Sequence, residues 1–244
     1  MKVVTAKALA ASRQLDVSIE LLFSDREPLA VRTLAAAAHA VFADLVEHKR
    51  PGESWRNRLI QDSGLPRDAA INVLNGASNF LKHADRDPED ELSFEEEEND
   101  YLIFFATLEC GELGHQLSLT MQAFQVWYLA CHPEHIGESE EIVRKAKTAF
   151  PEFSNLERQA RLKEVLQFLP SGQLPVGFAC RQLPLMSNVE PTLRVVSTAL
   201  RMVIRRLARE ARSNQRLQWA FAAQTSFTPR PPLIRGAVTI SCYR

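Results

Sequence analysis

The sequence predicts an all-α protein, a multi-helix bundle with an Arg-rich helical appendage at its C-terminal end. Apolar residues recur at helical spacing along most of the chain. Only 9 of the 244 residues are glycine, which favours long helices over turns. Helix start and stop signals separate the periodic segments. We therefore expect a helical bundle domain over residues 1–170, a linker over 171–190, and an Arg-rich helix with an irregular tail over 191–244.

The first two helices are predicted over residues 3–23 and from Pro28 to about Lys49. A stop-and-restart signal, Ser24–Pro28, separates them, with a proline in the first turn of the second helix. His39 shares a face with apolar residues of the second helix, so we expect it to point inward. A short amphipathic helix over 54–62 follows.

A third long helix begins near Pro66 and carries an unusual polar stripe. Asn72, Asn75, Asn79 and His83 follow one another at spacings of three, four and four, so they stack on one helix face. Asn costs roughly 0.5 kcal/mol or more against Ala inside a helix, so a merely solvated face would favour other residues. Two interpretations stand: a half-buried seam that is hydrogen-bonded within the fold, or a surface that receives a ligand.

The end of this helix is acidic and stops at a proline. Pro88 disfavours helical geometry at Asp87, so we expect the helix to end near there. A structured turn is favoured over a hard-metal site, because one His-x-Asp-x-Asp offers too few ligands. We take the stripe and the turn together as candidate ligand-binding residues, with no metal and no cofactor: Asn72, Asn75, Asn79, Lys82, His83, Asp85, Arg86 and Asp87.

The second half of the bundle is predicted from its apolar runs and caps. Residues 85–100 hold ten Asp/Glu and one Arg, and they end in a candidate capping box at Ser93–Glu96. Tyr101–Cys110 is apolar nearly all round, which indicates a central, buried helix. Three further helices are expected over 118–131, 138–149 and 155–169, the last with a capping box at Ser154–Glu157.

One short motif, Cys131-His132-Pro133-Glu134-His135, places several metal-ligand residue types close together. Because no second pair stands at zinc-finger spacing, the sequence alone favours coincidence over a metal site. The E-x-x-H pair Glu112–His115 is likewise single, whereas di-iron bundles need two such motifs and further carboxylates.

Cysteine usage and hydropathy point to a cytoplasmic protein. The four cysteines are scattered, with no C-x-x-C and no secretory leader, so we expect reduced thiols. No apolar run approaches the length of a transmembrane segment, so none is predicted.

Charge divides the chain into two halves. Residues 1–170 hold 18 Lys+Arg against 28 Asp+Glu, whereas residues 171–244 hold 11 Arg and no Lys against two Glu. An Arg-rich helix can bind nucleic acid or an acidic membrane surface. It can equally fold back on the acidic segment 85–100, and a homodimer is a further possibility.

The residues Asn79–Pro88, N-F-L-K-H-A-D-R-D-P, resemble the signature of a family of uncharacterised bacterial all-helical proteins. The resemblance extends to Arg13–Asp16 and Thr33–His39 and covers roughly residues 5–170. It implies an all-helical fold and brings no activity with it.

A fainter similarity is to the HEPN superfamily of helical-bundle ribonucleases and nucleotide-binding proteins. Their active site uses an Arg a few residues ahead of a His, often with a polar residue between them. His83 and Asn79 match the His and the polar residue, whereas Gly76, Ala77 and Ser78 stand where the Arg belongs.

Taken together, the sequence favours a non-enzymatic protein that binds a partner protein or small ligand through the Asn72–Asp87 surface. The alternative is a HEPN-like ribonuclease or nucleic-acid-binding protein that uses His83 and Asn79. The acidic segment 85–100 opposes phosphate binding there. No P-loop, Rossmann fingerprint, nucleophile elbow or HExxH occurs.

Overall fold

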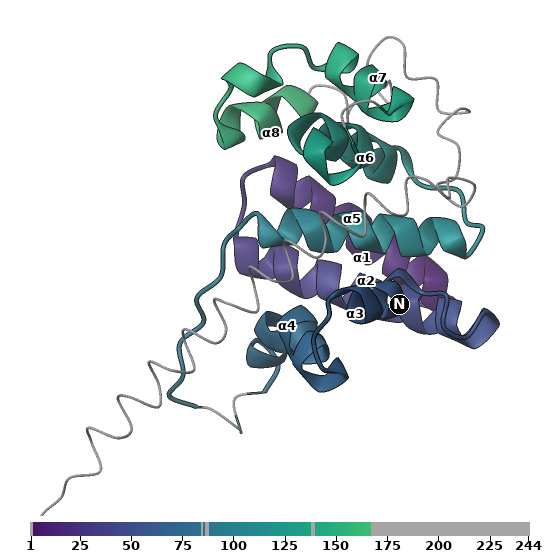
Figure 1. The fold of residues 1–244 in the computed structure, drawn as a ribbon. Coiled ribbons are helices and arrows are strands. Elements are labelled where there is room, and N and C mark those ends of the chain that lie inside the picture. Colours follow the sequence, from purple (N-terminus) through teal and green to yellow (C-terminus); the bar gives the residue numbers. More distant parts are fainter. Residues whose placement is uncertain (1, 84, 86–87, 138–139, 167–244) are drawn as a thin grey trace, which may run out of the picture. The chain divides into compact units, whose positions relative to one another are not determined.

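Helices α1 (Lys7–Phe23) and α2 (Pro28–Lys49) form an antiparallel hairpin, as the stop-and-restart signal predicts. The computed structural model describes residues 2–83, 85, 88–137 and 140–166, which all belong to one unit (Figure 1). The linker and the Arg-rich tail lie outside the described residues. Within the described ranges the fold is all-α, and it continues with α3 (Trp55–Asp62), α4 (Arg67–Phe80), α5 (Glu98–Glu112), α6 (Leu119–Cys131), η1 (Pro133–His135), α7 (Glu141–Ala149), η2 (Phe153–Asn155) and α8 (Arg158–Leu166).

Helix α5 is the central element, as its apolar composition predicts. It packs against α1, α2, α3 and α6, and its residues from Leu102 to Cys110 are all buried (Figure 1). Arg32, near the start of α2, pairs with Glu98 at 3.7 Å, and Arg50, just after α2, pairs with Glu112 at 2.6 Å. Because the starts meet and the ends meet, α2 and α5 run in the same direction.

Helix α6 supplies the aromatic part of the core. Trp127 is buried edge-on against Phe23 of α1 at a centroid distance of 5.6 Å. Tyr128 stacks on Phe104 of α5 at 4.1 Å. These ring contacts fix α6 between the first and fifth helices and set the position of the chain that follows it.

Several predicted helix boundaries differ from the structure. α1 begins at Lys7 rather than at residue 3, and α7 begins at Glu141 rather than at residue 138. α5 begins at Glu98 after Glu97, so the Ser93 capping box does not start it. α8 begins at Arg158, after the Ser154–Glu157 box, because Arg158 is held by a buried carboxylate on α5. α4 ends at Phe80, well ahead of Pro88. Local residue preference thus placed these ends only to within several residues.

Helix α2 is the one helix among the described residues that is long and apolar enough to cross a membrane, with a mean hydropathy of 1.5 over the relevant stretch. The buried core helix of a soluble protein meets the same criterion. Here 44% of the stretch is buried within the bundle, where α2 packs against α1 and α5. Length and composition are therefore weak evidence for a span.

Glu47 ties the end of α2 to the start of α3. Its carboxylate accepts the backbone N–H of Gly52 at 2.7 Å and of Ser54 at 2.9 Å. Burial alone would raise the pKa of Glu47, but the hydrogen bonds from Ser54 and Gly52 outweigh it and lower the pKa from 4.5 to about 2. The ionised carboxylate thus stabilises the fold above pH 4.5, and this stabilisation is lost as the pH falls towards 2.

The variant Glu47→Gln should lower the free energy of unfolding at pH 7 by about 1 kcal/mol, a value discounted because solvent screens this site. Urea unfolding at pH 7 and at pH 3 measures the effect, which should be smaller at pH 3. Glu91→Gln, on an exposed connection, is the control and should change little. An equal loss at both pH values would contradict the role assigned to the charge.

Candidate functional site

The predicted polar stripe lies on the outer face of α4. The helix packs against α2 and α3 and buries Ala70, Ala77 and Ser78. Asn72, Asn75 and Asn79 are exposed to solvent, on the other side of the helix. The stripe therefore faces outward rather than forming a seam between helices.

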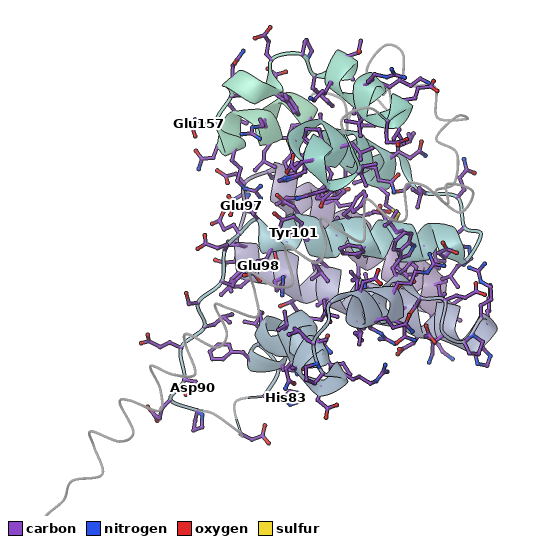
Figure 2. All side chains as sticks on the ribbon, viewed as in Figure 1. His83, Asp90, Glu97, Glu98, Tyr101 and Glu157 are labelled. Atoms are coloured by element: carbon purple, nitrogen blue, oxygen red, sulfur yellow. The ribbon has the colours of Figure 1, made fainter. Side chains whose placement is uncertain are left out.

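The turn after α4 carries the other predicted residues of this surface. The backbone N–H groups of Lys82 and His83 both donate to the carbonyl of Asn79, at 3.1 and 3.0 Å, and these bonds close the helix. His83 is half-buried, whereas Lys82 and Asp85 are exposed. Figure 2 shows His83 at the end of α4 and Asp90 farther along the connection to α5. Arg86 and Asp87 lie outside the described residues.

The inward position predicted for His39 is confirmed. It is 6% exposed on the side of α2 that faces the core. Burial lowers its pKa to about 4, and the nearby charges of Arg56 and Arg32 act in the same direction. His39 is therefore a neutral core residue.

A second group of side chains converges where α6 ends. Pro133 stops α6 and opens the single turn η1, which turns His132, Glu134 and His135 towards one another. One potential ligand atom from each of these residues lies within 4.8 Å of the others. The two imidazole rings stack at a centroid distance of 5.0 Å and an interplanar angle of 8°. We call these three residues the histidine turn.

Glu134 lies between the two imidazoles. Its Oε1 is 3.4 Å from His135 Nε2 and 3.8 Å from His132 Nδ1. The Glu134 side chain is 60% exposed, whereas those of His132 and His135 are 16% and 15% exposed. The histidine turn is thus open to solvent on the side of the carboxylate and covered on the side of the rings.

Buried groups from other helices contact the far side of both imidazoles. The hydroxyl of Tyr128 on α6 lies 3.0 Å from His135 Nδ1. Asp100, fully buried near the start of α5, places Oδ2 3.9 Å from His132 Nε2, an ion-pair distance rather than a hydrogen bond. Arg158, the first residue of α8, binds Asp100 in a bidentate fork, with N–O distances of 2.9 and 2.5 Å.

The aromatic ring of Tyr101 completes the wall of the turn. Its centroid lies 5.8 Å from that of His132 and 5.4 Å from that of His135. Figure 2 shows Tyr101 in the first part of α5, with Glu97 near the start of α5 and Glu157 at the start of α8. Four elements, α5, α6, η1 and α8, therefore position one small group of titratable side chains.

The protein environment separates the pKa values of the two histidines. Burial alone would lower the pKa of His132, but Asp100 and Glu134 outweigh it and raise this pKa. Burial and the neighbouring charge of His132 lower the pKa of His135 to about 4. His132 lowers the pKa of Glu134 to about 2, against the smaller opposing effect of burial. The pKa values of the two stacked imidazoles are thus shifted in opposite directions.

The spacing of the histidine turn is visible in the sequence, but its supporting residues are not. Tyr128, one turn ahead of His132 on α6, was a local signal that could have been used. Asp100 is the last acidic residue before the apolar run Tyr101–Cys110, and this position does not by itself indicate that it contacts a histidine. Arg158 could not be linked to Asp100 by any pattern in the chain. No family model, curated protein or solved structure matches the sequence.

Proposed function

We propose that this protein is a non-enzymatic binding module that takes a partner through the Asn72–Asp87 surface of α4 and the turn after it. The outward position of Asn72, Asn75 and Asn79 carries the proposal. Each amide offers two donors and an acceptor, and three in a row can hydrogen-bond a partner at repeated spacing. Because Asn is a poor helix former, three of them on an exposed face cost stability that a merely solvated surface has no need to lose.

The charge around this surface indicates the kind of partner. Asp85, Glu89, Asp90 and Glu91 follow α4 and are all exposed. Such a segment attracts cations and repels phosphate. We therefore infer that the partner is a separate arginine-rich polypeptide.

The test is the binding of a fluorescent nona-arginine peptide to the full-length protein, measured by fluorescence anisotropy at low salt. Reversing Glu89, Asp90 and Glu91 to Lys should weaken binding by roughly tenfold or more, because the attraction depends on local charge. Replacing Asn72, Asn75 and Asn79 by Ala should weaken it further.

The matched control reverses three acidic residues elsewhere, Glu20, Glu140 and Glu152, and so makes the same change in net charge. Equal losses in both charge variants, or no saturable binding, would contradict the proposed surface.

A HEPN-like ribonuclease is the second candidate, because half-buried His83 lies next to exposed Asn79 and is hydrogen-bonded to it through the backbone. The second arm of the same experiment incubates structured RNA with the full-length protein and with His83→Ala, with and without divalent metal. We expect intact RNA in every case. RNA cleavage by the wild-type protein that is lost in His83→Ala would favour the ribonuclease function over the binding function.

A further inference from the structure

We propose that His132, Glu134 and His135 bind a divalent transition-metal ion, with Tyr128 and Asp100 orienting the two imidazoles. This inference concerns the histidine turn alone and is independent of the partner proposed for α4.

The distances around Glu134 suit a shared ion. Two donor atoms that each lie 2.0–2.1 Å from a tetrahedral ion are about 3.3 Å apart. Glu134 Oε1 lies 3.4 Å from His135 Nε2 and 3.8 Å from His132 Nδ1. Two edges of the ligand triangle therefore already have nearly the length that coordination requires.

The third distance, between the coordinating nitrogens of His132 and His135, must shorten through a movement of side chains. The ligand atoms of the turn all lie within 4.8 Å of one another, so the two imidazole nitrogens must approach by at most about 1.5 Å for both to reach one ion. Because the rings stack with an interplanar angle of 8°, their in-plane lone pairs do not converge as they stand, and coordination requires at least one ring to rotate about its side-chain torsions. The exposed Glu134 side chain is free to follow.

Each imidazole has a separate partner for its second nitrogen. If His135 coordinates through Nε2, its Nδ1 faces the Tyr128 hydroxyl at 3.0 Å. If His132 coordinates through Nδ1, its Nε2 faces the Asp100 carboxylate at 3.9 Å. Metal-binding histidines almost always hydrogen-bond such a partner through the second nitrogen. The Tyr128 contact already has hydrogen-bond length, whereas the Asp100 contact must shorten by about 1 Å when His132 coordinates. Both coordinating nitrogens are thereby the ones that face Glu134.

The second nitrogen of His132 has an unusually firm support. Asp100 is fully buried, and the Arg158 guanidinium holds both of its oxygens. A buried, fixed carboxylate behind one imidazole and a buried hydroxyl behind the other are features of a built site. A chance cluster of surface histidines lacks them.

The donor set indicates the class of ion. Two imidazoles and one carboxylate suit borderline ions such as Zn²⁺, Co²⁺ or Ni²⁺ rather than Mg²⁺ or Ca²⁺, which prefer all-oxygen ligands. Three protein donors leave one position of a tetrahedral ion for water or a small ligand. Glu134 is the most exposed of the three, so this open position lies towards solvent.

The experiment titrates the untagged, metal-free, full-length protein with Zn²⁺ by calorimetry and with Co²⁺ by visible absorption. We expect one equivalent to bind and the Co²⁺ complex to show the intense visible bands of four-coordinate geometry, with Mg²⁺ unable to displace it. Glu134→Gln keeps the shape of an exposed side chain, so the protein should still fold, although it loses the stabilisation that the lowered pKa of Glu134 indicates. It should weaken Zn²⁺ binding by roughly 100-fold, since losing a direct ligand should cost no less than losing an outer partner.

A second variant tests the support rather than the ligands. Tyr128→Phe removes only the hydroxyl beside His135 Nδ1, so it should weaken binding by about 10–100-fold while one equivalent still binds. His48→Gln, an exposed histidine elsewhere, and Cys131→Ala, a thiol beside the turn, are the controls and should leave the affinity unchanged.

Two results would overturn the proposal. One is the absence of saturable Zn²⁺ and Co²⁺ binding by the folded wild-type protein. The other is wild-type affinity in Glu134→Gln, which would show that the Glu134 carboxylate is not a ligand. In either case the histidine turn is only a hydrogen-bonded end of α6.

Discussion

Replacing Arg158 by Met should lower the free energy of unfolding by about 3–5 kcal/mol, the usual cost of leaving a buried charge without its partner. Asp100 is fully buried, and Arg158 binds both of its carboxylate oxygens. In the variant, His132, at 3.9 Å, is the one charge partner that the Asp100 carboxylate keeps among the described residues. The first turn of α8 would also lose its attachment to α5.

Chemical denaturation followed by circular dichroism measures this loss. Lys163→Met, an exposed substitution on the same helix, is the matched control and should stay within about 0.5 kcal/mol of wild type. The double variant Arg158→Met/Asp100→Leu should recover much of the stability, because an apolar pair can replace a buried ion pair. A loss below about 1 kcal/mol in the single variant would show that the fork contributes little.

Removing the charge of Glu109 should stabilise the protein, that is, raise its free energy of unfolding at alkaline pH. Glu109 is fully buried on α5, where Oε1 accepts the backbone N–H of Arg56 at 2.9 Å. Oε2 is buried and has no hydrogen-bond partner among the described residues. Burial raises the pKa of Glu109 from 4.5 to about 7, although the N–H and charge of Arg56 oppose it.

The sign of the pH dependence follows from this raised pKa. Between pH 4.5 and 7 the folded protein holds a proton that the unfolded chain has released, so stability falls as the pH rises through this window. Glu109→Gln removes this dependence of the free energy of unfolding on pH. It should raise the free energy of unfolding at pH 8 by about 1–3 kcal/mol, less than the full shift because the new amide N–H groups also need partners.

Urea unfolding at pH 5 and pH 8 measures this difference, which should be near zero at pH 5 and largest at pH 8. Glu91→Gln again serves as the exposed control and should show no such change. A gain of the same size at both pH values would mean that packing, not ionisation, explains the effect.

The fold was largely predictable because apolar residues recur at helical spacing and helix start and stop residues separate the segments. The all-round apolar run from Tyr101 to Cys110 indicated the central helix, and Pro28 marked the start of α2. Helix ends were harder, because capping residues at Ser93 and at Ser154 compete with long-range contacts. The first residue of α8, Arg158, binds Asp100, which lies 58 residues away, and no local pattern predicts this contact.

The candidate sites were predictable only in part. Helical spacing correctly grouped Asn72, Asn75 and Asn79 on one helix face. Spacing alone could not show whether this face points to solvent or to another helix. Whether that face binds a partner stays a prediction. The residues of the histidine turn were recognised in the sequence as potential metal ligands within one short motif. Its interpretation depends on Asp100 and Tyr128, whose approach to the turn is a property of the packed helices.

The parallel course of α2 and α5 also constrains how the protein folds. Two parallel neighbours cannot be joined by a tight turn, so residues 50–97 must carry the chain back along the bundle, and α3 and α4 lie within that return. The central helix pair can form only after this long loop closes, which costs entropy and slows folding. Shortening the return while keeping both helices should therefore speed refolding.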